Sequence, residues 1–522
     1  MRIRLPATIW VVLLLLIAGD RNAAAQGNRV VTIEDWPNAY IERLQRRGHM
    51  TDLNPTDFPY REREIVRSMA NVNRDDLPSL ERIWFDALAE HFSRSLPGGE
   101  ETVVGGSFTG RLRAADGRRL DPLRPIDNEA RAYQAAVIQF YGESRRWIAH
   151  FGLRHDWYYD RDPDAIDTAN RLFIRSEDAY VGYGGKLVSA YVGRYHFHWA
   201  PLADDALFIS SNPRSFDAID FRIGGRKVSL RSIFGELDSI TADGRYTGAA
   251  GADSVLVGSE RRLIVAHRID WRPSRHFQLT ALESTIFSGS NTSLSPRLLN
   301  PAHGWGFESD NRPKNDENNG LLGGLVWMNF DRLTIHGQLL IDDVDLQGTT
   351  DEPWSYALAG SIVYAGIAQR ADIGFRLTLV ASRTFNADQV EGQYIYVNRG
   401  IATQFSDYVH GRFFGDIYLD DIVRGLSVSP RFELLRQGEF DMRDPFPDDE
   451  LGSLLTGTIE DTYRGAVRVY YQPSRRWWVG ADLGVNHVRN AKHIDGAVDT
   501  RFSGMLTVGA RVSISSGIDL WN

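Results

Sequence analysis

The chain has 522 residues, a net charge of −9 and no cysteine. Without cysteine there is no disulfide framework, no thiol nucleophile and no cysteine-ligated zinc site. The acidic balance disfavours nucleic acid as a partner, because a polyanion is bound through an excess of lysine and arginine.

The N-terminus has the order of segments found in a cleavable secretory signal. Two arginines are followed by an apolar run from Ala7 to Gly19, and then by the small residues Ala23-Ala24-Ala25. The apolar run is shorter than the ~20 residues that a membrane-spanning helix needs. We therefore expect residues 1–25 to be a signal peptide that is removed on export.

The next part of the chain, residues 26–100, is expected to form a periplasmic helical segment. Tyr60 to Met69 is charged and rich in arginine, and a second helix is expected after the cap residue Asp76 and Pro78. Apolar residues recur there at helical spacing, which predicts a helix packed by one face. They are Leu80, Ile83, Trp84, Ala87 and Leu88, followed by His91.

After Gly105 the hydrophobic period changes to two, which is the period of a β-strand. In Thr462 to Tyr471, apolar and aromatic residues alternate with Arg464 and Arg468. An apolar face toward lipid and a polar face toward a lumen are typical of an outer-membrane barrel. Two later strands repeat the pattern, with Trp477, Val479, Ala481, Leu483 and Val485 on one face of the first, and Phe502, Leu506, Val508, Ala510, Val512 and Ile514 on one face of the second.

Connection lengths distinguish a barrel from a soluble sandwich. Tight turns such as Gln472-Pro473-Ser474-Arg475 alternate with long polar stretches such as Ser288 to Gly320 and Phe385 to His410. Outer-membrane barrels have short periplasmic turns and long extracellular loops. We therefore predict an all-β fold with a small helical part, in which residues 101–522 form a transmembrane antiparallel β-barrel of about 18 strands in the bacterial outer membrane.

Signatures of common enzymes are missing from the chain. It contains no HExxH, no GxSxG elbow, no Walker loop and no GxGxxG. His196 and His198, expected on one face of a strand, lack a third ligand nearby, so we predict no metal site there. The acid-rich stretches Asp310 to Asn319 and Asp444 to Glu450 could capture calcium but are expected to be solvated loops. We expect no enzymatic activity and no cofactor.

The lumen of the predicted barrel carries charge of both signs. Burial of an unpaired charge costs several kcal/mol, so inward arginines are expected to pair with inward acids. The alternative is a basic lining for an acidic polymer or solute. The residues concerned are Arg376, Arg464, Arg468 and Arg511, with Asp482 as an acidic partner.

Several blocks of the sequence resemble the Wzi-type capsule-assembly proteins of the outer membrane. The segment from Gly182 to Arg222 carries Val192-Gly193-Arg194, His198-Trp199-Ala200-Pro201, Leu207 to Asn212, and Phe216. Further blocks follow in the order of that family, and the resemblance as a whole spans roughly Asp76 to the C-terminus. They are His267-Arg268, the strand Leu279 to Phe287 with Glu283, Leu299-Asn300-Pro301 and Leu339 to Asp343.

The resemblance implies an 18-stranded barrel with a periplasmic helical bundle and a lectin-like role in capsule assembly. The implied partners are capsular or exopolysaccharide, the lipid of the outer membrane and, as a further partner, the polysaccharide export machinery. Aromatic faces stack on sugar rings, and arginine donates to hydroxyls and carboxylates. The candidate polysaccharide-binding residues are Arg194, Trp199, Arg268, Trp305 and Trp354, although membrane-interface anchoring is the alternative for each tryptophan.

Two other functions remain open from the sequence. A channel for sugar uptake or polysaccharide export would have the same strand count and a polar lumen. An outer-membrane hydrolase would need histidine, acid and serine side chains that the fold brings together. Conductance measurements separate a binding barrel from a channel, and an activity screen addresses the hydrolase.

Overall fold

The structure is a computed structural model, and the predicted signal peptide lies outside the residues it describes. The described residues are 27–95, 102–117, 121–125, 129–157, 174–239, 261–288, 300, 317–343, 354–447 and 451–518.

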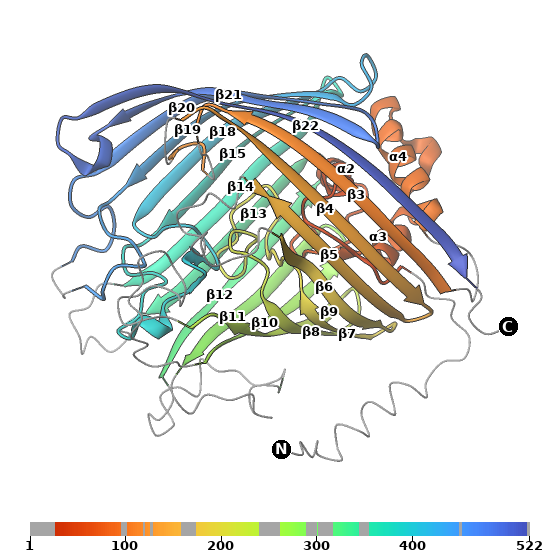
Figure 1. The fold of residues 1–522 in the computed structure, drawn as a ribbon, viewed down its shortest axis with the longest axis horizontal. Coiled ribbons are helices and arrows are strands. Elements are labelled where there is room, and N and C mark those ends of the chain that lie inside the picture. The colour runs from red at the N-terminus through yellow and green to blue at the C-terminus, as the bar shows by residue number, and fades with distance from the viewer. Residues whose placement is uncertain are drawn as a thin grey trace.

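Eighteen antiparallel strands close into one barrel, in which β22 pairs with β3 (Figure 1). The predicted fold class is confirmed. The strands are β3 (Thr102–Ala115), β4 (Arg131–Ser144), β5 (Trp147–Asp156), β6 (Ile174–Gly184), β7 (Val188–Arg194), β8 (Asp217–Gly224), β9 (Val228–Leu237), β10 (Arg262–Ser274), β11 (Phe277–Ser288), β12 (Glu317–Phe330), β13 (Leu333–Asp343), β14 (Ser355–Ile367), β15 (Ala371–Val380), β18 (Tyr408–Tyr418), β19 (Leu426–Gln437), β20 (Glu460–Ser474), β21 (Trp477–Arg489) and β22 (Val498–Ile518).

The two faces of each strand differ as the alternation predicts. On β22 the side chains of Phe502 and Val512 are 56% and 61% exposed on the outer face, whereas Ser503 is fully buried. A closed barrel pairs its backbone groups between neighbouring strands, so an apolar outer face can lie in lipid without an unpaired edge.

Short and long connections alternate around the barrel, as expected. Arg145–Arg146 joins β4 to β5, whereas residues 381–407 lie between β15 and β18. The short turns gather at one end of the barrel, which is the periplasmic end in barrels of this type.

The N-terminal helices sit at the short-turn end of the barrel (Figure 1). We call residues 27–95 the plug. No helix within the described ranges is long and apolar enough to cross a membrane. The plug contains β1 (Val30–Val31), α2 (Pro37–Arg46), β2 (Tyr60–Arg61), α3 (Glu62–Met69), η1 (Arg74–Asp76) and α4 (Ser79–Ser95).

The plug has its own apolar core, formed by the helix faces that the sequence predicts. Leu44, Ile65, Trp84 and Leu88 are each at most 1% exposed and belong to one cluster. The indole Nε1 of Trp84 donates to Asp420, which follows β18, at 3.1 Å. The core of the plug is therefore continuous with the barrel wall.

Ion pairs also attach the plug to several strands. Arg47 donates to Asp372 of β15 at 2.8 Å, and Glu34 accepts from Arg154 of β5 at 3.0 Å. On β22, Arg511 lies 2.9 Å from Asp35. The pairs are spread around the circumference, so they fix the plug across the periplasmic opening.

The plug is expected to loosen in acid. His91 of α4 packs edge-on against Trp36, with ring centroids 5.2 Å apart. Burial, together with the charge of Arg29, lowers the pKa of His91 from 6.5 to about 3. Protonation of His91 therefore favours the undocked plug. The contribution of neutral His91 to the free energy of docking is fully present above pH 6.5 and falls by up to about 1.4 kcal/mol per pH unit toward pH 3.

Hydrogen exchange of the plug amides across this pH range measures the effect. The variant His91→Gln has no titrating ring at this position. The protection of its plug amides should therefore fall less steeply than in the wild type between pH 6.5 and about 3. The same slope in both proteins would contradict the role of His91.

Two long connections fold into the lumen. We call residues 195–216 the inner loop and residues 381–407 the second loop, which contains η5 (Val390–Gly392), β16 (Ile395–Tyr396) and β17 (Arg399–Gly400). The inner loop reaches the plug, where the amide of Phe58 donates to the carbonyl of His198 at 3.0 Å. The two loops join where Tyr394 donates to the carbonyl of Phe208 at 2.8 Å. Their side chains form one core with the inner faces of the strands.

Candidate functional site

A cavity of about 930 Å³ lies between the two loops and the inner wall of β18 to β22. We call it the outer cavity, because residues of the long connections at the end opposite the plug line it, among them Arg443 and η6 (Ala491–His493). The inner loop contributes His198 and Asp204. The cavity therefore faces the outside of the cell, and the inner loop separates it from the plug.

Asp204 anchors the inner loop to the barrel wall. Its carboxylate accepts from Ser361 at 2.5 Å and from Arg376 at 2.7 Å, and it lies 2.8 Å from Nδ1 of His336. The three partners come from β14, β15 and β13. Ser361 donates to the aspartate and not to the histidine, so this group lacks the contact by which a base activates a serine nucleophile.

The wall of the outer cavity combines an aromatic ring with paired charges. The guanidinium of Arg124 lies 4.7 Å from the ring centroid of Phe405, which is partly buried. Arg412 donates to Glu433 at 2.8 Å, and Arg443 donates to Asp441 at 2.8 Å. Such a wall offers part of an aromatic ring together with donors and acceptors for hydroxyl groups.

Comparison with known proteins gives a match in fold. No family model and no curated protein matches the chain. Among solved structures it is similar to Wzi, described as an outer-membrane protein involved in group 1 capsule assembly in Escherichia coli and as a carbohydrate-binding β-barrel. The TM-score is 0.63 at 11% identity, over 92% of this chain and 99% of that one. The outer-membrane protein OpdK of Pseudomonas aeruginosa matches with a TM-score of 0.45 at 11% identity, over 80% of this chain and 99% of that one.

The protein is an outer-membrane β-barrel. The closed 18-stranded barrel with its lipid-facing apolar surface, together with the fold shared with Wzi, places it in the bacterial outer membrane. At 11% identity the likeness to Wzi shows the fold alone.

Two of the predicted sugar-contacting residues are buried in the lumen. Trp199 and Arg268 are both 0% exposed, and the guanidinium of Arg268 lies 5.5 Å from the indole centroid of Trp199. Arg268 also donates to Asp270 at 2.6 Å and to the carbonyl of Thr56 in the plug at 2.7 Å. Contrary to their predicted contact with polysaccharide, neither side chain presents a surface to a polymer.

The other candidate residues do not gather around the outer cavity. Arg194 ends β7 and pairs with Asp217, the first residue of β8. Trp354 is 57% exposed just before β14 and is the one described candidate tryptophan open to solvent or lipid. Trp305 lies outside the described residues.

The inward arginines are paired, two of them with Asp482 and two with acids that only the fold reveals. Arg464 and Arg468 donate to Asp482 at 2.9 and 3.3 Å. Arg376 instead holds Asp204 of the inner loop, and Arg511 holds Asp35 of the plug. The ion pairs thus tie both lumen-filling segments to the wall.

The histidine pair does not lie on one strand face, so that expectation is wrong. β7 ends at Arg194, and His196 and His198 follow in the inner loop. His196 lies 3.8 Å from Glu177, whereas His198 contacts the carbonyl of Asp204. Within the described parts of the chain, no cluster of three or more histidine or acidic residues could hold a metal ion.

Proposed function

We propose that this barrel binds capsular or exopolysaccharide in the outer cavity and holds it at the cell surface without altering it chemically. The observation that carries the proposal is the position of the cavity. It faces outward above a lumen that the inner loop, the second loop and the plug fill. The fold shared with Wzi and the sequence blocks that resemble Wzi-type proteins support the same function.

The charged residues that line the cavity indicate which kind of polymer it can bind. Its carboxylates are Asp121, Asp204, Asp205, Glu433, Glu439, Asp441, Asp444 and Glu460, and its cationic side chains are Arg124, Arg399, Arg412, Arg443, Arg501 and Lys492. Some of these acids are neutralised by arginines behind the lining, since Asp204 pairs with Arg376 and Glu433 with Arg431, so the cavity carries no strong excess of either sign. We expect recognition through hydroxyl groups and ring faces, with arginine as one donor among several.

A channel for sugar uptake or polysaccharide export is the second candidate, and one observation favours it. A smaller cavity of about 240 Å³ lies between the plug and the wall of β3 to β6. It shares the lining residues Ser211, Asn212 and Arg399 with the outer cavity. Transport along this polar route would require the plug contacts at Glu34 and Asp35 to open.

Replacing the aromatic ring of the outer cavity tests the binding proposal. Phe405→Ala is expected to weaken binding of the purified surface polysaccharide by about 10- to 100-fold, because a stacked phenyl ring contributes about 1.5–3 kcal/mol. The measurement is titration of labelled polysaccharide onto the full-length barrel in detergent.

Phe413→Ala is the matched control. Phe413 is 57% exposed on the outer face of β18, so its ring contacts lipid or detergent and not the cavity. The control should bind the polymer like the wild type. Equal affinities of Phe405→Ala and the wild type would refute binding at this wall.

A further inference from the structure

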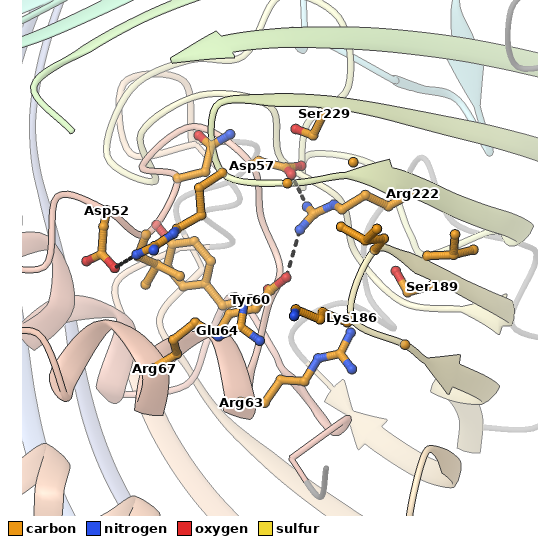
Figure 2. Close-up of a pocket in the computed structure, with 18 of the residues that line it drawn as sticks. Asp52, Asp57, Tyr60, Arg63, Glu64, Arg67, Lys186, Ser189, Arg222 and Ser229 are labelled. Atoms are coloured by element: carbon orange, nitrogen blue, oxygen red, sulfur yellow. Dashed lines mark hydrogen bonds and ion pairs between the residues drawn. The ribbon is translucent and has the colours of Figure 1, made fainter. Parts of the chain in front are cut away.

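A second pocket lies at the periplasmic end, and the proposed polysaccharide site makes no use of it (Figure 2). It has a volume of about 120 Å³ and lies between α3 of the plug and the turns that join β6 to β7 and β8 to β9. We call it the rim pocket. Ser189 and Arg222, paired across β7 and β8, also line it, with Asp57 of the plug opposite, so it lies inside the barrel mouth.

The acids of the rim pocket are already neutralised. Asp57 pairs with Arg222, which also donates to Glu64 at 2.9 Å. Asp52 lies 3.3 Å from Arg226 of the β8–β9 turn. These carboxylates therefore leave little negative charge for other cations in the pocket.

Arg272 of the pocket wall donates to the backbone carbonyls of Thr51 and Asp52, which leaves three other cationic side chains. Within the described residues, Arg63, Arg67 and Lys186 make no ion pair, although all three line the pocket. Figure 2 shows Arg63 and Lys186 next to each other, below the ion pairs that Arg222 makes with Asp57 and Glu64.

Of these cations Arg63 is half-buried, whereas Arg67 and Lys186 are exposed. Arg63 and Arg67 are four residues apart on α3, where like charges repel. Burial lowers the pKa of Arg63, and Arg61 and Arg67 lower it as well, against the opposing effects of Tyr191 and Glu64. The backbone of Gly184 approaches the Arg63 guanidinium closely, and a Cβ there would lie 2.6 Å from a guanidinium nitrogen. The arginine is thus held in the pocket.

We propose that the rim pocket binds one phosphate group, presented from the periplasmic side. The Arg63 guanidinium on α3 and the Lys186 ammonium in the β6–β7 turn lie next to each other and can donate to different oxygens of one phosphate, while Arg67 adds positive charge to the same pocket. Charge-assisted hydrogen bonds of this kind are among the strongest in proteins. The volume admits a single such group with a few waters. The phosphate belongs either to a soluble periplasmic molecule or to a phospholipid headgroup of the inner leaflet.

Binding of inorganic phosphate to the full-length barrel in a neutral detergent, measured by calorimetry, tests the site. The variant Arg63→Gln/Lys186→Gln is expected to lose at least tenfold in affinity, whereas Lys186→Arg keeps it. The control Lys227→Gln/Arg476→Gln removes the same charge from exposed turns at the same end, outside the pocket. It should bind phosphate like the wild type. All variants are first checked for folding by hydrogen exchange of the plug.

A second arm distinguishes the two sources of phosphate. The barrel is placed in nanodiscs of neutral lipid with or without phosphatidylglycerol, and phosphate is titrated into each. If phosphatidylglycerol weakens phosphate binding in the wild type but not in Arg63→Gln/Lys186→Gln, the bound phosphate belongs to a lipid headgroup. If phosphatidylglycerol leaves the titration of the wild type unchanged, the ligand is a soluble molecule. The proposal is overturned if the wild type shows no saturable binding of phosphate or anionic lipid, or if the control double variant weakens binding as much as the pocket variant.

Discussion

The Asp57→Ala variant is expected to lose about 1.5–3 kcal/mol of the free energy that docks the plug, because it removes hydrogen bonds between a buried carboxylate and charged donors. The arginines keep their other acids, which are Glu64 for Arg222, Asp220 for Arg231 and Asp270 for Arg268. Asp57 is 2% exposed and pairs with Arg222 of β8 and Arg231 of β9. Arg268 of β10 lies 3.7 Å away. One carboxylate thus connects the plug to three strands, and Arg231, which is 1% exposed, has no access to water that would replace it.

Hydrogen exchange of the plug amides and the rate of protease cleavage within residues 27–95 measure the loss. Asp75→Ala is the matched control, since the Asp75 side chain is 87% exposed and its pair with Arg74 spans 3.6 Å. Exposed pairs of this kind contribute about 0–1 kcal/mol. Equal protection of the plug in both variants would show that the buried ion pairs do not hold it.

The Asp204→Ala variant is expected to open the lumen. The wild type should show no steady conductance in a planar bilayer, because the inner loop and the second loop fill the barrel. Without Asp204, the guanidinium of Arg376 and the buried ring of His336 lose their shared acceptor. A loss of about 3–5 kcal/mol at this anchor corresponds to open events more than about a hundredfold more frequent than in the wild type.

The neighbouring substitution Asp205→Ala is the control for this experiment. Asp205 accepts one hydrogen bond from Thr378 at 2.6 Å, so its removal is expected to cost about 1 kcal/mol. Its conductance should resemble that of the wild type. Steady conductance in the wild type itself would favour the channel over the binding barrel.

The barrel was predictable because its signals are local. The alternation in β20 to β22 and the alternating connection lengths follow from the period of a strand and from the topology of membrane barrels. The helix around Trp84 was equally visible in its apolar spacing. The short strands β1 and β2 have two residues each and leave no such pattern.

The outer cavity was not predictable, since its walls come from separate segments. Arg124, Phe405 and Arg412 lie in the connection after β3, in the second loop and on β18, and no spacing links them. Trp199, in contrast, was predicted to contact sugar but does not lie on an open surface. Its residue type suits sugar stacking, but the inner loop turns into the lumen and buries it.

The acidic partners of two inward arginines could not be predicted for the same reason. Alternation placed Arg376 and Arg511 on the inner face correctly, yet their acids lie in the inner loop and the plug. Both acids are more than a hundred residues away in sequence from the arginines they pair with. Only the closed lumen brings them together.

Surface polysaccharide in a strain that lacks this protein gives the most direct test of the proposed function. The cell-attached and released fractions are separated and measured, with the wild-type gene and the Phe405→Ala variant as complementing copies. The account predicts normal synthesis with polymer shed into the medium, restored to the surface by the wild type and not by the variant. Unchanged attachment in the deletion strain would contradict it.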